Sequence, residues 1–305
     1  MHLSIPVIEA EVFAEVPAEL HWRGGPTPWL KGRPWGVPPA FLEGPGFGRD
    51  GFLYCVDIAY GRIFRISPEG KFELYVQYDG EPNGLRIHRD GRIFIADHKR
   101  GIMVIDPRTR KVEPYLTEID GKPLVGPNDL VFNAEGEIFF TDMGDSDLAS
   151  PYGRLVGIDN AGTPRVLLDK LAAPNGLAIN RAGTALYLNM FRQNAIWQMS
   201  FTPDGGVSRI AHFIQLSGGL GPDGLIMDEE DNLLIAHGGL GCVWVYSSLG
   251  EPLMRINSPR GKMTTNIAFG IDDPNRIYIT DSSTSTILTA HLPTRGRTPF
   301  SHIDG

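Results

Sequence analysis

Six short segments of the sequence share one polar pattern. Each begins with a carboxylate or amide residue, continues through a run rich in β-forming residues, and reaches a second polar residue fourteen or fifteen positions later. The first residues are Glu43, Asn83, Asn128, Asn175, Asp223 and Asn266. The second are Asp57, Asp97, Asp142, Asn189, His237 and Asp281. Carboxylate and amide oxygens are the ligands that Ca²⁺, Mg²⁺ and Mn²⁺ prefer. The segments could therefore bind a divalent cation if the fold brings them together.

The spacing of the six segments predicts how they meet. Successive first residues lie 40, 45, 47, 48 and 43 positions apart. A period in this range, with several short strands in each unit, is typical of propeller blades. The sequence therefore predicts an all-β fold, a six-bladed β-propeller with four-stranded antiparallel blades around a central channel. We expect one domain over residues 1–305.

In a propeller the first strand of each blade lines the channel, and a hairpin returns its last residue to the starting end. The six segments should thus form a ring of oxygen-bearing side chains at one mouth. Crowded carboxylates repel one another, and a bound cation would relieve that repulsion. The alternative explanation is local, because Asn, Asp and Gly often open strands as turn formers and cap backbone groups.

Two segments lie outside the repeats. Residues 7–14 alternate like a strand, and we expect them to close the last blade as its outer strand; residues 298–303 compete for that place. Residues 18–42 hold three tryptophans among prolines and glycines, which is typical of an ordered functional loop. We interpret it as a lid whose Trp29 and Trp35 contact a substrate. Packing outside the propeller and a subunit contact are the alternatives.

The composition excludes several classes of partner. The chain has 28 basic and 36 acidic residues, a formal charge of −8 and no basic stripe, which argues against nucleic acid and anionic membranes. Only Cys55 and Cys242 are present, so no disulfide framework is expected. We see neither a signal-peptide pattern nor a transmembrane stretch and expect a cytoplasmic protein. The oligomeric state stays open.

Four motifs carry a family resemblance. They are Leu42-Glu43-Gly44-Pro45, Gly126-Pro127-Asn128-Asp129, Ala173-Pro174-Asn175-Gly176-Leu177-Ala178 and Gly221-Pro222-Asp223-Gly224. In this order and spacing the chain resembles, from about residue 8 to 290, the senescence-marker-protein/gluconolactonase family. That family of six-bladed propellers includes regucalcin and bacterial lactonases.

The resemblance implies a hydrolase that opens a lactone, a small-molecule substrate, with one divalent metal ion. Its metal ligands fall on Glu43, Asn175 and Asp223, and Asp223 would also accept a proton from the attacking water. Ca²⁺ is the first expectation for the ion, with Mn²⁺, Zn²⁺ and Mg²⁺ as the others. The resemblance also makes Asn128 and Asp142 candidate substrate contacts.

One departure from the family pattern concerns the substrate. The sugar-lactone enzymes carry an arginine two residues before the Asn of the Asn-Asp motif, where this chain has Gly126. Their downstream glutamate finds only Asp145 or Ser146 nearby. The expected substrates therefore include non-sugar lactones and related cyclic esters.

Other residues and other functions remain open from the sequence. His98 and His237, which close or follow two hairpins, are alternative proton carriers, and His237 is also a candidate substrate contact. The chain could instead be a non-catalytic ligand-binding propeller with a structural ion. A third alternative is a metal-free propeller enzyme of the strictosidine-synthase kind.

Overall fold

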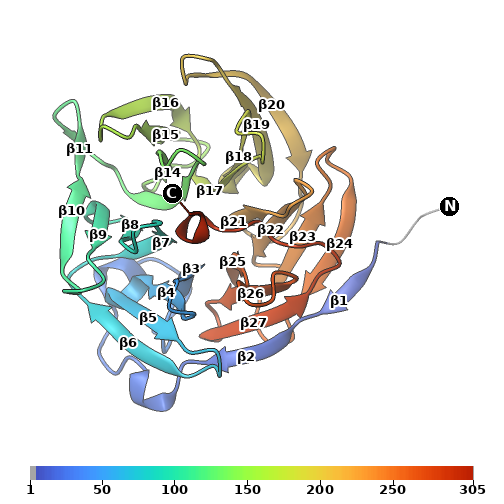
Figure 1. Ribbon diagram of the computed structural model, residues 1–305. Helices are drawn as coiled ribbons and strands as arrows, with labels where there is room; N and C mark the ends of the chain where they lie inside the picture. Colours follow the sequence, from blue (N-terminus) through green and yellow to red (C-terminus); the bar gives the residue numbers. More distant parts are fainter. Residues whose placement is uncertain (1–4, 305) are drawn as a thin grey trace.

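The computed structural model describes residues 5–304 and places six sheets around one axis, as Figure 1 shows in a view along that axis. The sheets follow one another in chain order, and neighbouring strands within the repeated part are antiparallel. The predicted six-bladed β-propeller is confirmed. Among the described residues, helical structure is limited to five short 3-10 helices.

The strands of the blades have the following bounds. Blade 1 has β3 (Leu42–Phe47), β4 (Leu53–Asp57), β5 (Arg62–Ile66) and β6 (Phe72–Gln77). Blade 2 has β7 (Pro82–Ile87), β8 (Ile93–Asp97), β9 (Gly101–Ile105) and β10 (Val112–Leu116). Blade 3 has β13 (Pro127–Phe132), β14 (Ile138–Asp142), β15 (Gly153–Ile158) and β16 (Pro164–Leu171). Blade 4 has β17 (Pro174–Ile179), β18 (Ala185–Met190), β19 (Ala195–Phe201) and β20 (Val207–Gln215).

The last two blades include the N-terminal strands. Blade 5 has β21 (Gly221–Met227), β22 (Leu233–Gly238), β23 (Cys242–Tyr246), β24 (Pro252–Asn257) and β1 (Val7–Glu9). Blade 6 has β25 (Thr264–Phe269), β26 (Arg276–Asp281), β27 (Thr286–His291) and β2 (Glu11–Glu15). A small hairpin, β11 (Glu118–Ile119) and β12 (Lys122–Pro123), separates blades 2 and 3. The 3-10 helices are η1 (Ala18–Leu20), η2 (Pro28–Leu30), η3 (Ile58–Tyr60), η4 (Phe191–Gln193) and η5 (Phe300–His302).

The N-terminal strands join the two ends of the repeat. The expected outer strand at residues 7–14 is divided in two: β2 pairs antiparallel with β27 and completes the last blade as expected, whereas residues 7–9 do not belong to that blade. Strand β1 pairs parallel with β24 and so adds a fifth strand to blade 5. Residues 298–303 do not compete for this edge, because they include η5 and lie across the central channel (Figure 1). Strands β24 and β27 are therefore both paired within the molecule, which makes them unavailable for pairing with a strand of another protein.

The strand register defines equivalent positions in the six blades. Leu42, Pro82, Pro127, Pro174 and Thr264 pair with the last residue of the second strand in blades 1, 2, 3, 4 and 6, and in blade 5 Pro222 pairs with His237, one residue before the end of β22. The next residue in each blade stands at the channel mouth, and these are Glu43, Asn83, Asn128, Asn175, Asp223 and Thr265. In blade 6 the mouth residue is therefore Thr265, and Asn266 lies one layer deeper. In blade 4 the paired end residue is Met190 rather than Asn189.

Both differences from the sequence interpretation have the same physical reason. The expectation matched residues by type, choosing Asn266 and Asn189 because other blades carry polar residues at similar spacing. A shift of one residue changes the direction in which a strand side chain points. Asn189 consequently faces the neighbouring blade, where its side-chain amide donates to the main-chain oxygen of Asp223 at 2.7 Å.

The layer below the mouth is made mostly of glycine. Blades 1, 2, 4 and 5 have Gly44, Gly84, Gly176 and Gly224 at this position. A Cβ atom on Gly176 would lie 2.4 Å from the main-chain oxygen of Asp223, so a larger residue would push the two strands apart. The remaining two blades carry Asp129 and Asn266 in this layer. The glycines bring the strands close together and leave room for these two polar side chains.

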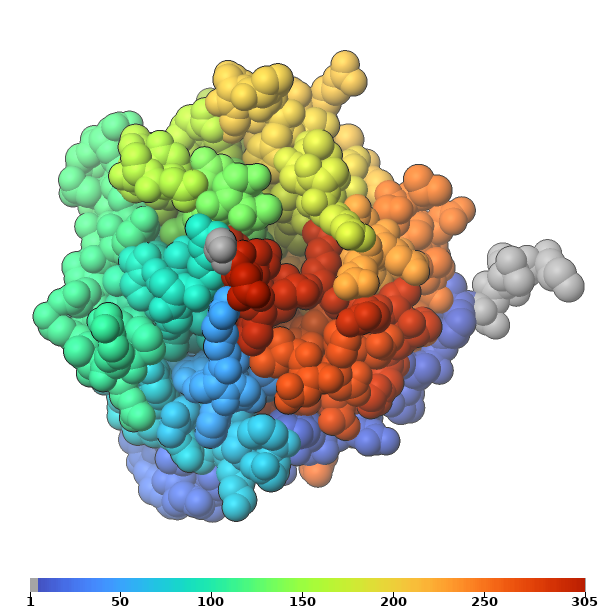
Figure 2. Space-filling model, viewed as in Figure 1, coloured from blue at the N-terminus to red at the C-terminus, as the bar shows by residue number. Residues whose placement is uncertain are grey.

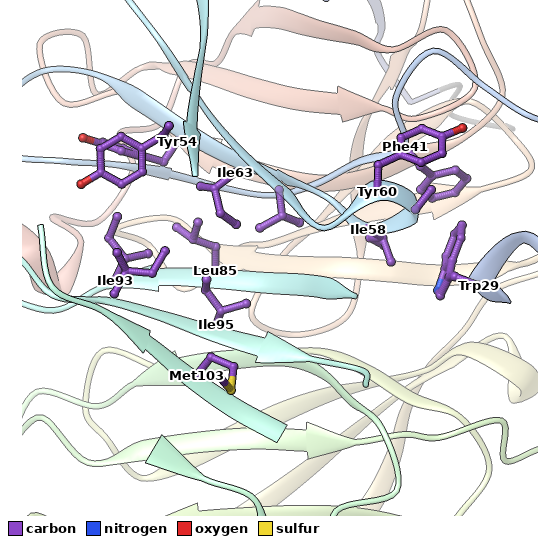
Figure 3. Packing of buried hydrophobic residues seen from close by; sticks show 14 of the residues in the cluster. Trp29, Phe41, Tyr54, Ile58, Tyr60, Ile63, Leu85, Ile93, Ile95 and Met103 are labelled. Atoms are coloured by element: carbon purple, nitrogen blue, oxygen red, sulfur yellow. The ribbon is translucent and has the colours of Figure 1, made fainter. Parts of the chain in front are cut away.

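Apolar side chains pack between neighbouring blades. The cluster shown in Figure 3 joins blades 1 and 2, including Ile63, Leu85 and Ile95, which are almost fully buried. Trp29 of η2 belongs to the same cluster, and its ring packs edge-on against Phe41 with centroids 4.9 Å apart. The loop at 18–42 is thus fixed to the propeller by buried aromatic contacts. Within residues 5–304 no helix is long and apolar enough to cross a membrane.

The close approach at Gly176 can be tested by adding one methyl group. We expect Gly176→Ala to lower the free energy of unfolding by about 1 to 3 kcal/mol, because the added carbon would meet the main chain of blade 5. The matched control is Gly25→Ala, since nothing lies within 4 Å of a Cβ there, and it should change stability by less than about 0.5 kcal/mol. Urea unfolding measures both, and equal effects would contradict the close-approach explanation.

Candidate active site

A cavity of about 890 Å³ opens at the channel mouth. All six mouth residues line it, one from the first strand of each blade. Trp29 and Trp35 of the loop at 18–42 line it as well. The structure therefore brings together six of the side chains singled out from the sequence: Glu43, Asn128, Asn175, Asp223, Trp29 and Trp35.

Two buried carboxylates at the mouth lack a cationic partner. Glu43 is 3% and Asp223 is 9% exposed, and no Lys, Arg or His in residues 5–304 lies within 4.0 Å of either carboxylate. Elsewhere, buried carboxylates are paired: Asp57 accepts from Arg62 at 2.7 Å, and Arg154 is bound to Asp142. Among the described residues, Glu43 and Asp223 therefore have no positive side chain that would balance their charge when they are ionised.

The pKa values express the same imbalance. Burial raises the pKa of Glu43 well above its usual range, and the nearby charges of Asp223 and Asp129 raise it further. Burial likewise raises the pKa of Asp223, with Asp129 adding to the effect, while a hydrogen bond with the Asn175 side chain opposes it. A cation between these groups would stabilise their charged forms.

Below the mouth, Asn266 connects the charged groups. Its side-chain nitrogen donates to Glu43 Oε2 at 2.9 Å and to Asp129 Oδ2 at 3.3 Å. Asp129 Oδ1 also accepts the main-chain N–H of Leu130 at 2.8 Å, and the guanidinium of Arg86 lies 3.6 Å away. Asn266 therefore orients one oxygen of Glu43 from beneath, while Arg86 balances the charge of Asp129.

The sequence interpretation did not include Asp129 among the site residues. A signal was present, because the aligned position is glycine in four of the six blades and a carboxylate in the third. An acidic residue in a layer of glycines indicates that its side chain enters the space they leave. The pairing with Asn266, 137 positions further along the chain, had no local signal.

Two other candidate substrate contacts lie behind the cavity wall. Asp142 is fully buried, accepts the main-chain N–H groups of Val125 and Gly126 at 2.9 Å each, and is paired with Arg154. His237 is also fully buried and bonds to the main-chain oxygen of Gly218 at 3.0 Å. Neither lines the mouth cavity. In the structure both side chains are engaged by neighbouring loops, and their contact with substrate stays a prediction.

One wall of the cavity carries polar groups. His98 lines it, and a Cβ on Gly126 would lie 2.6 Å from the His98 ring, so the imidazole occupies the space beside this glycine. Burial lowers the pKa of His98, which favours the neutral ring near pH 7. Further out, Arg33 of the loop at 18–42 pairs with Asp145 at 3.4 Å across the cavity rim.

The residues at the mouth suit a divalent cation by their chemistry. In residues 5–304 no group of three or more His, Cys, Asp or Glu side chains is placed to hold one ion. An ion at the mouth would therefore depend on amide oxygens, such as that of Asn175, together with the carboxylates of Glu43 and Asp223. Mixed carboxylate and amide ligands of this kind are those of Ca²⁺ and Mg²⁺ sites, and the unpaired carboxylates supply the charge.

Residues 41–283 match the family described as SMP-30/gluconolactonase/LRE-like region. The chain belongs to this family. Among its relatives, the lactonase drp35 of Staphylococcus epidermidis is 28% identical over 295 residues, covering 90% of this chain and 85% of the relative. The lactonase drp35 of Staphylococcus aureus is 26% identical over 270 residues, covering 84% and 78%.

Solved structures show the same fold. A gluconolactonase from Xanthomonas campestris matches with a TM-score of 0.75 at 23% identity, covering 93% of this chain and 100% of the other. A calcium-binding protein, regucalcin, from Agrobacterium tumefaciens matches with a TM-score of 0.78 at 19% identity, covering 97% and 98%. The fold of this SMP-30/gluconolactonase family member is thus shared over nearly its whole length.

The role of Asn266 beneath Glu43 can be tested by stability. We expect Asn266→Leu to lower the free energy of unfolding by about 2 to 3 kcal/mol in EDTA, because two buried carboxylates lose a shared donor. Asn160→Leu, at an exposed turn, is the control and should change it by less than about 0.5 kcal/mol. Urea unfolding decides, and an Asn266 effect no larger than the control would contradict the assignment.

Proposed function

We propose that this protein is a metal-dependent hydrolase that opens a lactone or a related cyclic ester. The observation that carries the proposal is a pair of buried carboxylates, Glu43 and Asp223, at the mouth of an aromatic-walled cavity, with no cationic partner for either in the described part of the chain. The lactonase and gluconolactonase names of the relatives support the same class of reaction.

Glu43, Asn175 and Asp223 would hold the ion. They come from the first strands of blades 1, 4 and 5 and line one cavity. Ca²⁺ is the first candidate, because a relative in structure, the regucalcin of Agrobacterium tumefaciens, is described as a calcium-binding protein. When bound, such an ion polarises an ester carbonyl and stabilises the negative charge that develops on its oxygen.

The protein side chains would perform the remaining steps. Asp223 accepts a proton from the water that attacks the lactone carbonyl carbon, and as the ring C–O bond breaks it returns this proton to the leaving alkoxide oxygen, which gives a hydroxy acid. Asn128, which lines the same cavity, can donate a side-chain N–H to the substrate. Trp29 and Trp35 cover the reacting ring and reduce its contact with bulk water.

The walls of the cavity favour a substrate with an apolar part. Gly126, where the sugar-lactone enzymes carry an arginine, brings no charged side chain, and the adjacent His98, which lines the cavity, has its pKa lowered by burial, which favours the neutral ring. Trp29, Trp35 and Phe41 form an aromatic wall. We therefore include aliphatic lactones beside sugar lactones as candidate substrates, because polar side chains such as Glu81, Asn83 and Arg192 line the same cavity.

Hydrolysis of a lactone panel, sugar and aliphatic, tests the proposal. In a pH-stat assay we expect EDTA to abolish turnover and Ca²⁺, Mn²⁺, Zn²⁺ or Mg²⁺ to restore it. Asp223→Ala should lower kcat by at least about a hundredfold while circular dichroism shows a folded protein. Asp204→Ala, on an exposed turn, is the charge-matched control.

Two results would contradict the proposal in different ways. Tight binding of one ion without turnover of any lactone would favour a ligand-binding propeller with a structural ion. If the metal-loaded Asp223→Ala variant still turns over a lactone, Asp223 is not the proton acceptor, although the protein is still a hydrolase.

The aromatic wall predicts a separate effect on substrate choice. Replacing Trp29 and Trp35 together with Ala should raise KM for aliphatic lactones about tenfold, because apolar contact is lost. Cation affinity, measured by calorimetry, should change by less than about threefold, since neither indole belongs to the proposed ligand set. Trp22→Ala is the control, because Trp22 stacks on Tyr60 and does not line the cavity. Unchanged KM values across the panel would contradict the interpretation that Trp29 and Trp35 contact the substrate as part of a lid.

A further inference from the structure

The channel contains a second cavity at the end opposite the mouth. It has a volume of about 210 Å³ and is lined by residues from the first strands of all six blades. The C-terminal residues 297–301 cover it, and Figure 2 shows this segment in dark red across the centre of the face. We call it the lower channel cavity. It lies deeper along the same strands that carry the mouth residues.

The covering segment is held in place by several contacts. Arg297 donates to the main-chain oxygens of Asp228 at 2.9 Å and Ile179 at 2.6 Å, and it is paired with Asp231. The ring of Phe300 stacks on Phe132 with centroids 5.0 Å apart. The cover is therefore a built part of the fold, and the charge of Arg297 is already balanced.

The lower channel cavity is lined mainly by apolar side chains, together with two arginines, Arg86 and Arg297, and the hydroxyl-bearing residues Thr298 and Ser301. Its inner layer includes Val131, Ala178, Ile226 and Ala268, each from a different blade. Arg86 occupies the same layer in blade 2 and lines the cavity. Among the described residues that line it, none is acidic. The cavity therefore offers a positive charge at one end and apolar walls around it.

The guanidinium of Arg86 is incompletely satisfied. One terminal nitrogen donates to the main-chain oxygen of Leu85 at 2.8 Å, and within residues 5–304 its one acidic neighbour within 4.0 Å is Asp129, at 3.6 Å. That separation is longer than a hydrogen bond between charged groups, which is about 2.7 to 2.9 Å. A guanidinium has five N–H donors in a fixed fork, so Arg86 retains donors for a second anion.

We propose that the lower channel cavity binds a small monocarboxylate with a compact apolar body, with the carboxylate on Arg86. Arginine recognises a carboxylate through two parallel N–H donors. Apolar cavities of about 150 Å³ hold a benzene ring, so 210 Å³ has room for a one-ring carboxylate. The proposal does not depend on lactone hydrolysis or on a metal at the mouth.

Calorimetry with benzoate tests the proposal on the full chain in EDTA. EDTA removes any cation from the mouth, so benzoate has no metal ion to bind there and the lower channel cavity is the site under test. We expect saturable one-to-one binding of benzoate. Benzamide, which is neutral and similar in shape, should bind at least about tenfold more weakly, as expected for loss of a charged hydrogen bond.

Three variants locate the site. Arg86→Met should weaken benzoate binding by at least about tenfold, and Ala178→Leu should do the same by filling the cavity. Arg92→Met makes the same charge change just before β8, where the side chain is partly exposed and does not line the cavity, and it should leave binding unchanged. If Arg86→Met fails to fold by circular dichroism, Ala178→Leu decides alone.

The outcomes are distinct. Absence of benzoate binding by the wild type, equal affinity for benzamide, or retained affinity in folded Ala178→Leu would overturn the proposal. Loss of affinity in Arg92→Met equal to that in Arg86→Met would also overturn it, because the effect would then be one of net charge. The lactone assay is separate, so a failure here leaves the proposed reaction untouched.

Discussion

The close packing of six first strands around one axis is the constraint on which the rest of the structure depends. The strands can approach this closely only if the residues in the layer below the mouth have almost no side chain. In four of the six blades that residue is glycine. With the strands this close, side chains from blades far apart in sequence reach one another. Glu43, Asp223 and Asn175 share one cavity only because the blades close around the axis at this distance.

The same packing explains why buried charge is tolerated at the mouth. The carboxylates that end the second strands of several blades cap backbone N–H groups of the loops entering their own blades, as Asp57 does for Phe41 and Asp142 for Gly126. Those carboxylates stabilise the fold locally. Among the side chains that the structure describes, no positive one is paired with Glu43 or Asp223, and this distinguishes them from the carboxylates that cap backbone groups.

Charge changes sign along the channel. The mouth holds two unpaired carboxylates, the next layer holds Asp129 and Asn266, and the layer after that holds Arg86. In a medium of low polarity each group acts strongly on its neighbours. The mouth is consequently suited to a cation and the opposite end to an anion, although both ends are formed by the same six strands.

The fold, the number of blades and the core of the candidate site could all be predicted from the amino-acid sequence. The period of 40 to 48 residues and the polar residue before each β-rich run are local properties that the chain carries wherever it folds. They predicted that Glu43, Asn128, Asn175 and Asp223 meet at one mouth, and this is where the structure places them. The N-terminal strand of the last blade could also be predicted, because the alternation of apolar and polar residues in a strand is a local property of the sequence.

The strand register and the partners of the site residues depend on the folded molecule and could not be predicted from local sequence patterns. Thr265 rather than Asn266 stands at the mouth because strand pairing, and not residue type, sets which side chains face the cavity. Asp129 meets Asn266, and Arg86 enters the channel, only when blades 2, 3 and 6 close on one axis. Such contacts join residues far apart in the chain, so no local pattern records them. Their physical origin is closure of the propeller, which exists only in the folded molecule.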